Sequence, residues 1–309
     1  MSDASKLSEA KRALLEKYLR GEFPQTTKDM GTITRQAQGG PASLSNTDLR
    51  VPLLTIQTDG SKRPFFYLHV HYEGGAFYCF PLAHDLGAEQ PFYVLDPYNF
   101  DGLRVPPTLE DMTAAYIKSM RAVQPEGPYL LGGFCGGGVI AFEMARRLCE
   151  EGQTVDLLVL LEPGVGPLLM TSCGSFIHHL GKMIRLRPDK QLDCFLRIRH
   201  LCRFLFRLPY RNQQGLSLFP AVEALRQDWI GIFVWMFSAS KRPRRYHGKA
   251  TYFWASDDPY RRKTWPKLAE AKEAELHFIP GVHFSLITDQ LRVVSNQLKA
   301  CLDKVQTLH

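Results

Sequence analysis

The sequence predicts an α/β fold in which a mostly parallel sheet is covered by helices on both faces. Two observations lead to this prediction. Short, nearly continuous apolar runs alternate along the chain with longer segments of helical spacing, as strands buried on both faces do. A glycine-rich motif also stands directly between one such run and one such helical segment. Strand–helix alternation is typical of parallel strands joined by crossover helices.

The N-terminal part of the chain differs from the rest. Residues 7–20 predict a short amphipathic helix with Ser8 as its N-cap. Residues 28–50 are polar and rich in Gly, Ser and Thr, which is typical of a linker. We therefore divide the chain into an N-terminal helix and linker, residues 1–50, and one α/β domain, residues 51–309.

The α/β domain contains a regular succession of expected strands and helices. One helix should begin after Thr108, which can act as N-cap while Asp111 completes a capping box. A second helix should follow Gly136, and a last one should cover about 288–305. The expected strands are the apolar runs 65–70, 92–95, 129–132, 155–161, 250–254 and 275–279.

Residues 166–247 interrupt this alternation with helical spacing alone, so we expect an inserted helical lid. Within it, Phe195, Ile198, Leu201, Cys202 and Leu205 form one apolar stripe, and the nearby arginines lie mostly off it. Residues 181–210 also hold eight Lys or Arg against two Asp, within a chain of net charge +7. A basic surface of this kind attracts acidic partners.

Composition limits the class of protein. The 309 residues are 45% hydrophobic and 22% charged, which is typical of a globular protein. No apolar run approaches the roughly 20 residues of a transmembrane helix, and the first residues lack the layout of a signal peptide. Seven scattered cysteines without a CxxC pair argue against a disulfide framework and a zinc ribbon. We expect a cytoplasmic protein without a metal or a cofactor of its own.

The strongest local motif is G-x-C-x-G, from Gly133 to Gly137. It follows the run 129–132 directly and precedes a helical pattern, which is the context of a nucleophile elbow. The neighbours must be small because the turn holds the nucleophile in a strained conformation with its side chain exposed. The helix N-terminus would lower the thiol pKa of Cys135 from roughly 8.5. We therefore predict that Cys135 is the nucleophile of an α/β hydrolase.

The other readings of this motif are weaker. A phosphate-binding loop would need the remaining glycines of G-x-G-x-x-G or a Walker lysine, and neither is present. Free cysteines are usually small buried hydrophobes, and we assign that packing role to the cysteines outside the motif. These are Cys79, Cys149, Cys173, Cys194, Cys202 and Cys301.

Three motifs together resemble the type I thioesterase domains of nonribosomal peptide and polyketide synthases. Residues 127–138 (GPYLLGGFCGGG) match the elbow, 68–75 (LHVHYEGG) match the first strand and its turn, and 280–286 (PGVHFSL) match the histidine loop. The resemblance covers about residues 64–165 and 248–303. It implies an α/β-hydrolase fold and an enzyme that acts on acyl groups held as thioesters on a carrier protein.

His283 is the expected base. It follows the last expected strand, which is the chain order of an α/β hydrolase. The acid that orients it has two candidate positions. Glu162 ends the run 155–161 where the resembled family places its acid, usually Asp, and we favour it. Asp257 or Asp258 stands where many other α/β hydrolases place theirs, although a capped turn would explain this pair as well.

The oxyanion hole should use two backbone N–H groups. One is that of Gly136, directly after the nucleophile. The resemblance places the second at Tyr72, with Glu73 as its neighbour; the family usually has proline at the position of Tyr72 and serine at that of Cys135.

A cysteine nucleophile changes the expected outcome, because its acyl-enzyme is itself a thioester and remains activated. This favours transfer to an amine, a hydroxyl or a second carrier thiol, or ring closure, over simple hydrolysis. An acyl or peptidyl carrier protein is the expected partner, a small-molecule acyl acceptor is possible, and no nucleic acid is expected. Two alternatives remain: a dienelactone-hydrolase-like enzyme acting on small free lactones or esters, and a degenerate thioesterase that only binds carriers.

Overall fold

The computed structural model describes residues 53–69, 76–97, 103–205, 220–240 and 244–307. The chain divides into two units, residues 1–47 and 48–309, and every described residue belongs to the second. The expected helix at 7–20 and the linker at 28–50 lie outside the described residues. Within the described ranges, no helix is both long and apolar enough to cross a membrane.

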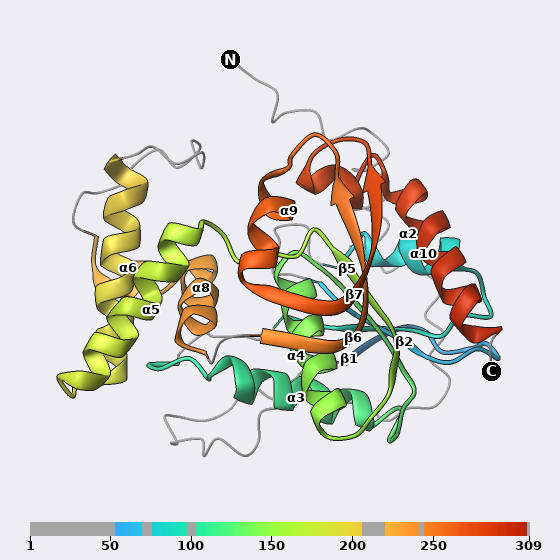
Figure 1. Cartoon of the computed structure of the whole chain (residues 1–309), viewed down its shortest axis with the longest axis horizontal. Helices are drawn as coiled ribbons and strands as arrows, with labels where there is room; N and C mark the ends of the chain where they lie inside the picture. The colour runs from blue at the N-terminus through green and yellow to red at the C-terminus, as the bar shows by residue number, and fades with distance from the viewer. Residues whose placement is uncertain (1–52, 70–75, 98–102, 206–219, 241–243, 308–309) are drawn as a thin grey trace, which may run out of the picture. The chain divides into compact units, whose positions relative to one another are not determined.

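The described unit is built on a seven-stranded sheet of order β1-β3-β2-β4-β5-β6-β7 (Figure 1). All neighbouring strands pair in parallel except β1, which is antiparallel to β3. This sheet confirms the predicted fold class. The strands are β1 (Leu53–Gln57), β2 (Phe65–Leu68), β3 (Phe92–Leu95), β4 (Tyr129–Phe134), β5 (Val155–Leu161), β6 (Arg244–Ala255) and β7 (Ala269–Ile279).

Helices connect the strands much as the sequence predicted. The capping box at the start of α3 is confirmed, because the Asp111 N–H donates to Thr108 Oγ1 at 3.0 Å and Thr108 N–H donates back to Asp111 Oδ2. The last helix begins at Leu291 rather than near Thr288, since residues 283–287 form a 3-10 turn first. The connecting helices are α2 (Cys79–Leu86), α3 (Leu109–Arg121), α4 (Gly136–Glu150), α9 (Tyr260–Thr264) and α10 (Leu291–Gln306).

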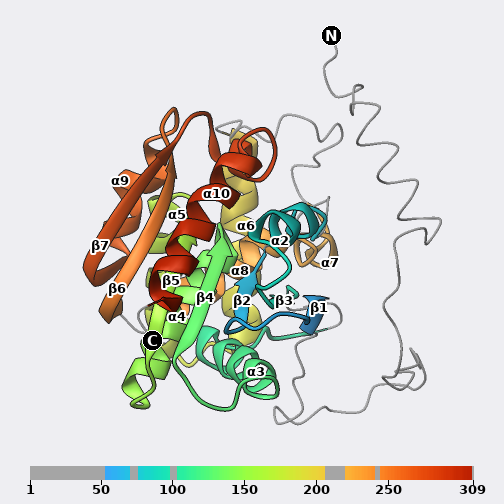
Figure 2. The same cartoon turned by 90° about the vertical axis from the view of Figure 1, so that its right-hand side faces the viewer.

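Two hydrophobic cores lie on the two faces of the sheet. Successive residues of a strand point to opposite faces. In β2, Phe65 therefore packs with α2 and α10, while Phe66 packs with α3 and α4. Figure 2 shows α10 and α2 on one side of the strands and α3 on the other. Burial on both faces explains why these strands are nearly continuous apolar runs.

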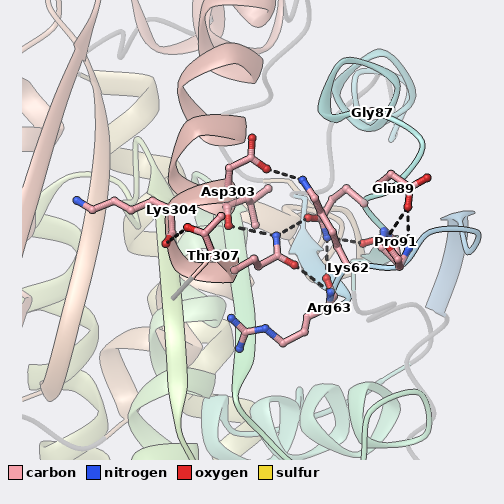
Figure 3. A network of polar contacts seen from close by, with 12 residues as sticks. Lys62, Arg63, Gly87, Glu89, Pro91, Asp303, Lys304 and Thr307 are labelled. Carbon is pink, nitrogen blue, oxygen red and sulfur yellow. Dashed lines mark hydrogen bonds and ion pairs between the residues drawn. The ribbon is translucent and has the colours of Figure 1, made fainter. Parts of the chain in front are cut away.

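A polar network fastens the C-terminal helix α10 to the segment that leads into β2 (Figure 3). Lys62 Nζ pairs with Asp303 Oδ1 at 2.5 Å, and the Arg63 N–H donates to Gln306 Oε1 at 2.9 Å. The Arg63 guanidinium also bonds Asp156 Oδ2 at 2.6 Å and the Val305 carbonyl at 3.1 Å. These contacts place the helix over one face of the sheet, where it covers the core formed with α2.

Four helices of the described residues lie between β5 and β6 and are called the lid below. They are α5 (Leu168–Met183), α6 (Pro188–Leu205), α7 (Val222–Leu225) and α8 (Trp229–Ala239). Side chains from all four share a small core, including Ile177, Phe195, Leu225 and Trp235. Helix α8 also gives Phe233, Met236 and Phe237 to the core between the sheet and α4.

The apolar stripe expected on α6 is only partly buried, because Phe195 and Cys202 pack in or against the lid core and the rest of the stripe is exposed. Phe195 is buried, but Ile198, Leu201 and Leu205 are exposed. The inward face instead carries Arg199, whose guanidinium bonds Asp228 Oδ2 at 2.9 Å. An ion pair of this kind allows a charged side chain to be buried, so the spacing of apolar residues alone does not identify the buried face.

Candidate active site

Cys135 stands between the end of β4 and the start of α4. Its backbone has φ 53° and ψ −119°, a left-handed conformation that non-glycine residues rarely adopt. The Cys135 N–H donates to the Leu161 carbonyl at 2.8 Å, which ties the turn to the neighbouring strand β5. The side chain is half-buried. The turn thus has the strained geometry and the helix position expected of a nucleophile elbow.

The glycines around Cys135 are required by close packing. A Cβ on Gly137 would lie 2.7 Å from the carbonyl carbon of Leu68 in β2 and closer still to its oxygen. A Cβ on Gly133 would lie 2.6 Å from the backbone of Gly137 itself. Both neighbours are backbone atoms and cannot rotate away. The motif therefore lets α4 begin directly against the strands.

Replacing Gly137 with alanine should lower the free energy of unfolding by about 3 kcal/mol or more, because backbone must move to admit the methyl group. Gly152→Ala is the matched control. Gly152 has φ +77° but no atom within 4 Å of an added Cβ, so it should lose only about 1 kcal/mol from backbone strain. Urea denaturation of both variants measures the difference. Equal losses would show that the elbow is not tightly packed.

His283 and Glu162 meet beside Cys135. His283 Nδ1 lies 3.2 Å from Glu162 Oε2, and the ring is close enough to the Cys135 thiol to lower its pKa. The imidazole stacks on Phe134 with ring centroids 4.6 Å apart and planes inclined by 20°. The carboxylate thus fixes one side of the ring and Phe134 fixes its plane. The three side chains come from the ends of the adjacent strands β4 and β5 and from the turn after β7.

Glu162 is fully buried and has an unusual backbone, with φ 46°. Its Oε1 accepts the Ala255 N–H at 2.7 Å, so the end of β6 positions the carboxylate. Burial raises the pKa of this carboxyl to about 7, although the Ala255 N–H and the charge of Arg261 oppose the rise. When His283 is protonated, its positive charge would favour the ionised carboxylate.

Arg261 is the residue that sequence reasoning missed. It lies in α9, its Nε is 3.8 Å from Glu162 Oε2, and its side chain is 22% exposed. The guanidinium rests against Gly164, where a Cβ would approach Nη1 to 2.6 Å. The residues around Arg261, Tyr260-Arg261-Arg262, match no sequence motif that would mark this arginine as functional. Only the pairing of β6 beside β5 brings Arg261 to the buried acid.

The surroundings of Cys135 favour its thiolate. Burial alone would raise the pKa of the thiol, but the positive charge of Arg261 lowers it, and so do the hydrogen bond and charge of His283. The Gly136 N–H at the start of α4 also lowers the pKa of the thiol. Together these groups hold the pKa of Cys135 at about 6. The sulfur is therefore mostly ionised at neutral pH.

The alkylation rate of Cys135 by iodoacetamide should rise with pH around a midpoint near 6, because the thiolate reacts. Arg261→Met removes a nearby positive charge and should move this midpoint upward by about one unit. Arg261→Lys should restore most of the shift. Arg262→Met is the matched control, since Arg262 lies over the Phe278 ring at 5.0 Å. A midpoint unchanged in Arg261→Met would contradict the role of this charge.

The other predicted site residues are distributed as follows. Asp257 accepts the Gly281 N–H at 3.1 Å, and Asp258 accepts the Tyr260 N–H at 3.0 Å, so both hold turns. Neither carboxylate has His283 as a partner in the described part of the chain. Tyr72 and Glu73 lie outside the described residues. Gly136 opens α4 directly after the nucleophile.

Comparisons with known proteins identify relatives for this arrangement. A family model described as "Thioesterase domain" matches residues 68–301. A dimodular nonribosomal peptide synthase of Bacillus subtilis is 42% identical over 113 residues, 36% of this chain and 5% of that protein. The nonribosomal peptide synthetase apvA of Aspergillus terreus is 34% identical over 194 residues, 62% of this chain and 18% of that protein. The chain thus spans less than a fifth of these relatives.

Solved structures share the fold. The NocB thioesterase domain from the nocardicin cluster has a TM-score of 0.50 at 23% identity, covering 81% of this chain and 98% of that one. A four-domain nonribosomal peptide synthetase has a TM-score of 0.53 at 19% identity, covering 80% of this chain and 20% of that one. At these identities the likeness establishes the α/β-hydrolase architecture.

Proposed function

Because the chain belongs to the thioesterase domain family, we propose that it is an acyl-transfer enzyme of nonribosomal peptide or polyketide biosynthesis. Its substrate is an acyl group held as a thioester on the phosphopantetheine of a carrier protein. Cys135 is the nucleophile, His283 the acid and base, and Glu162 the residue that orients the imidazole. The observation that carries this proposal is the group of three side chains at the ends of β4, β5 and β7.

The reaction begins with attack of the Cys135 thiolate on the thioester carbonyl. The carbonyl oxygen becomes an oxyanion, for which the Gly136 N–H is a suitable donor. We assign the second donor to Tyr72, as the family resemblance implies. Collapse of the intermediate forms the Cys135 thioester and expels the phosphopantetheine thiolate, which takes the proton held by His283.

The second half of the reaction returns the enzyme to its first state. His283 removes a proton from the acceptor, which then attacks the carbonyl of the Cys135 thioester. The carbon–sulfur bond breaks and the Cys135 thiolate leaves with the imidazolium beside it. The acyl-enzyme has the same bond type as the carrier substrate, so loading is nearly thermoneutral. This favours transfer to an amine, a hydroxyl or a second carrier thiol, or cyclisation, over hydrolysis.

The lid provides the surface for an acidic carrier protein. Lys182, Arg185 and Arg197 are exposed and have no ion-pair partner among the described residues. Other cations of the lid are already paired, such as Arg226 with Asp193 at 2.7 Å. All seven cysteines are free thiols, and a free thiol nucleophile suits a reducing compartment such as the cytoplasm.

Intact mass spectrometry tests the proposal. Incubation with a carrier protein that bears a phosphopantetheine-linked acyl group should add one acyl mass to the chain, and Cys135→Ala should remove this adduct. A chase with water, an amine or a second carrier then separates the outcomes. Loss of the acyl group to water faster than to every acceptor would overturn the transfer mechanism. Reaction with a free enol-lactone but not with the carrier would favour a dienelactone-hydrolase-like enzyme.

A further inference from the structure

Three side chains with metal-binding atoms meet between strand β7 and helix α10, away from Cys135. Glu275 and His277 lie two residues apart on the edge strand β7, so they share one face. Cys301 lies on α10, and its sulfur comes within 4.0 Å of the His277 ring. One carboxylate oxygen, one imidazole nitrogen and the thiol sulfur all lie within 4.8 Å of one another. The cysteine is buried and the other two side chains are partly exposed.

The contacts converge on a single nitrogen of His277. Its Nε2 lies 3.1 Å from Glu275 Oε1 and 4.0 Å from Cys301 Sγ. In a catalytic triad the acid and the nucleophile take opposite ring nitrogens of the histidine. Here both approach the same nitrogen. Three possible ligand atoms that lie this close together are in the arrangement of ligands around a single ion.

The distances between the donors suit a tetrahedral ion. With Zn–S of about 2.3 Å and Zn–N or Zn–O of about 2.0–2.2 Å, neighbouring ligand atoms lie about 3.3–3.6 Å apart. Two of the three observed separations, 3.1 and 4.0 Å, differ from this range by a few tenths of an ångström, and the third, between the carboxylate oxygen and the sulfur, is at most 4.8 Å. Small side-chain rotations would close the difference.

The neighbours of the three residues hold them in place. The His277 ring stacks on the buried Phe253, with centroids 4.7 Å apart and planes inclined by 9°. Lys249 binds the second oxygen of Glu275, Oε2, and leaves Oε1 directed at the histidine. Ordered partners behind the ligands are typical of metal sites.

We propose that Glu275, His277 and Cys301 form a zinc-binding site between β7 and α10, with solvent as the fourth ligand. A His/Cys/carboxylate set is suited to Zn²⁺, which accepts nitrogen, sulfur and oxygen together. The thiolate and the carboxylate balance the two positive charges of the ion. Burial raises the pKa of the Cys301 thiol in the absence of an ion, so binding should release a proton.

Cobalt(II) titration of the full chain tests this site, because a thiolate ligand produces a charge-transfer absorption. Every variant carries Cys135→Ala so that the reactive thiol cannot contribute. We expect one cobalt ion per chain, displaced by an equal amount of zinc. Cys301→Ala should abolish the absorption, and His277→Gln should weaken binding by about tenfold or more. Cys149→Ala and His247→Gln are matched controls with exposed side chains and should bind as the parent does.

Circular dichroism of each variant verifies that the fold is retained. The proposal is overturned if the parent shows no thiolate absorption, if the absorption survives Cys301→Ala, or if His277→Gln leaves the affinity unchanged. None of these results depends on acyl transfer, so the metal site and the proposed function can fail separately.

Discussion

Replacement of Cys135 with alanine is expected to lower kcat for acyl transfer by about 10⁴- to 10⁶-fold, since it removes the group proposed to form the covalent acyl intermediate. The position of the sulfur supports this expectation, because it is half-buried at the elbow, where His283 and the Gly136 N–H both lower the pKa of the thiol. Release of the free carrier thiol, followed with a thiol reagent added after quenching, measures the rate.

Cys149→Ala is the control for this variant. Cys149 is an exposed cysteine near the end of α4, so its loss should leave kcat unchanged. If Cys135→Ala retained more than about a tenth of the activity, the chain would act without a covalent intermediate. In that case His283 could only activate water directly, and the proposed mechanism would be wrong.

His283→Ala should produce the second-largest loss, about 10²- to 10⁴-fold in kcat, because the general base and the proton for the leaving thiol both disappear. It should also raise the pKa of Cys135, since a hydrogen bond and a positive charge that favour the thiolate are removed. The pH profile of iodoacetamide alkylation would then move upward. A merely structural role for the imidazole would not move this profile.

The exposed His247 provides the control for His283. His247→Ala should leave both kcat and the alkylation midpoint unchanged. An alkylation midpoint that stays near 6 in His283→Ala would contradict the pairing of the imidazole with the thiol.

The sequence was sufficient to predict the sheet and the meeting of the three side chains. Continuous apolar runs identify strands that are buried on both faces, and the carboxyl ends of parallel strands share one edge. The sequence alone therefore predicts that a residue at the end of such a run, like Glu162, lies close to the elbow. The sequence left Glu162 and the Asp257–Asp258 pair open as candidate acids, because both stand at the end of a strand at that same edge. In the structure, His283 Nδ1 lies 3.2 Å from Glu162 Oε2.

Other features depend on contacts that no local pattern records. The first strand, Leu53–Gln57, is only half-buried at the sheet edge, so its apolar pattern is weak. Arg261 reaches Glu162 from a short helix nearly a hundred residues later in the chain. A turn and most of a helix separate His277 from Cys301 in the sequence. The distance between them along the chain therefore could not indicate that their side chains meet.

Helix α8 has a consequence for anyone who wishes to alter the lid by exchange with another protein. Its sequence, WIGIFVWMFSA, is apolar all round because Trp235 faces the lid core while Phe237 faces the core of the sheet. A graft that replaced this helix would therefore disturb both cores together. In such a chimera, the exchanged segment should begin before Leu168 and end after Leu225. Residues 229–239 should keep their native sequence, so that the new segment packs against α8.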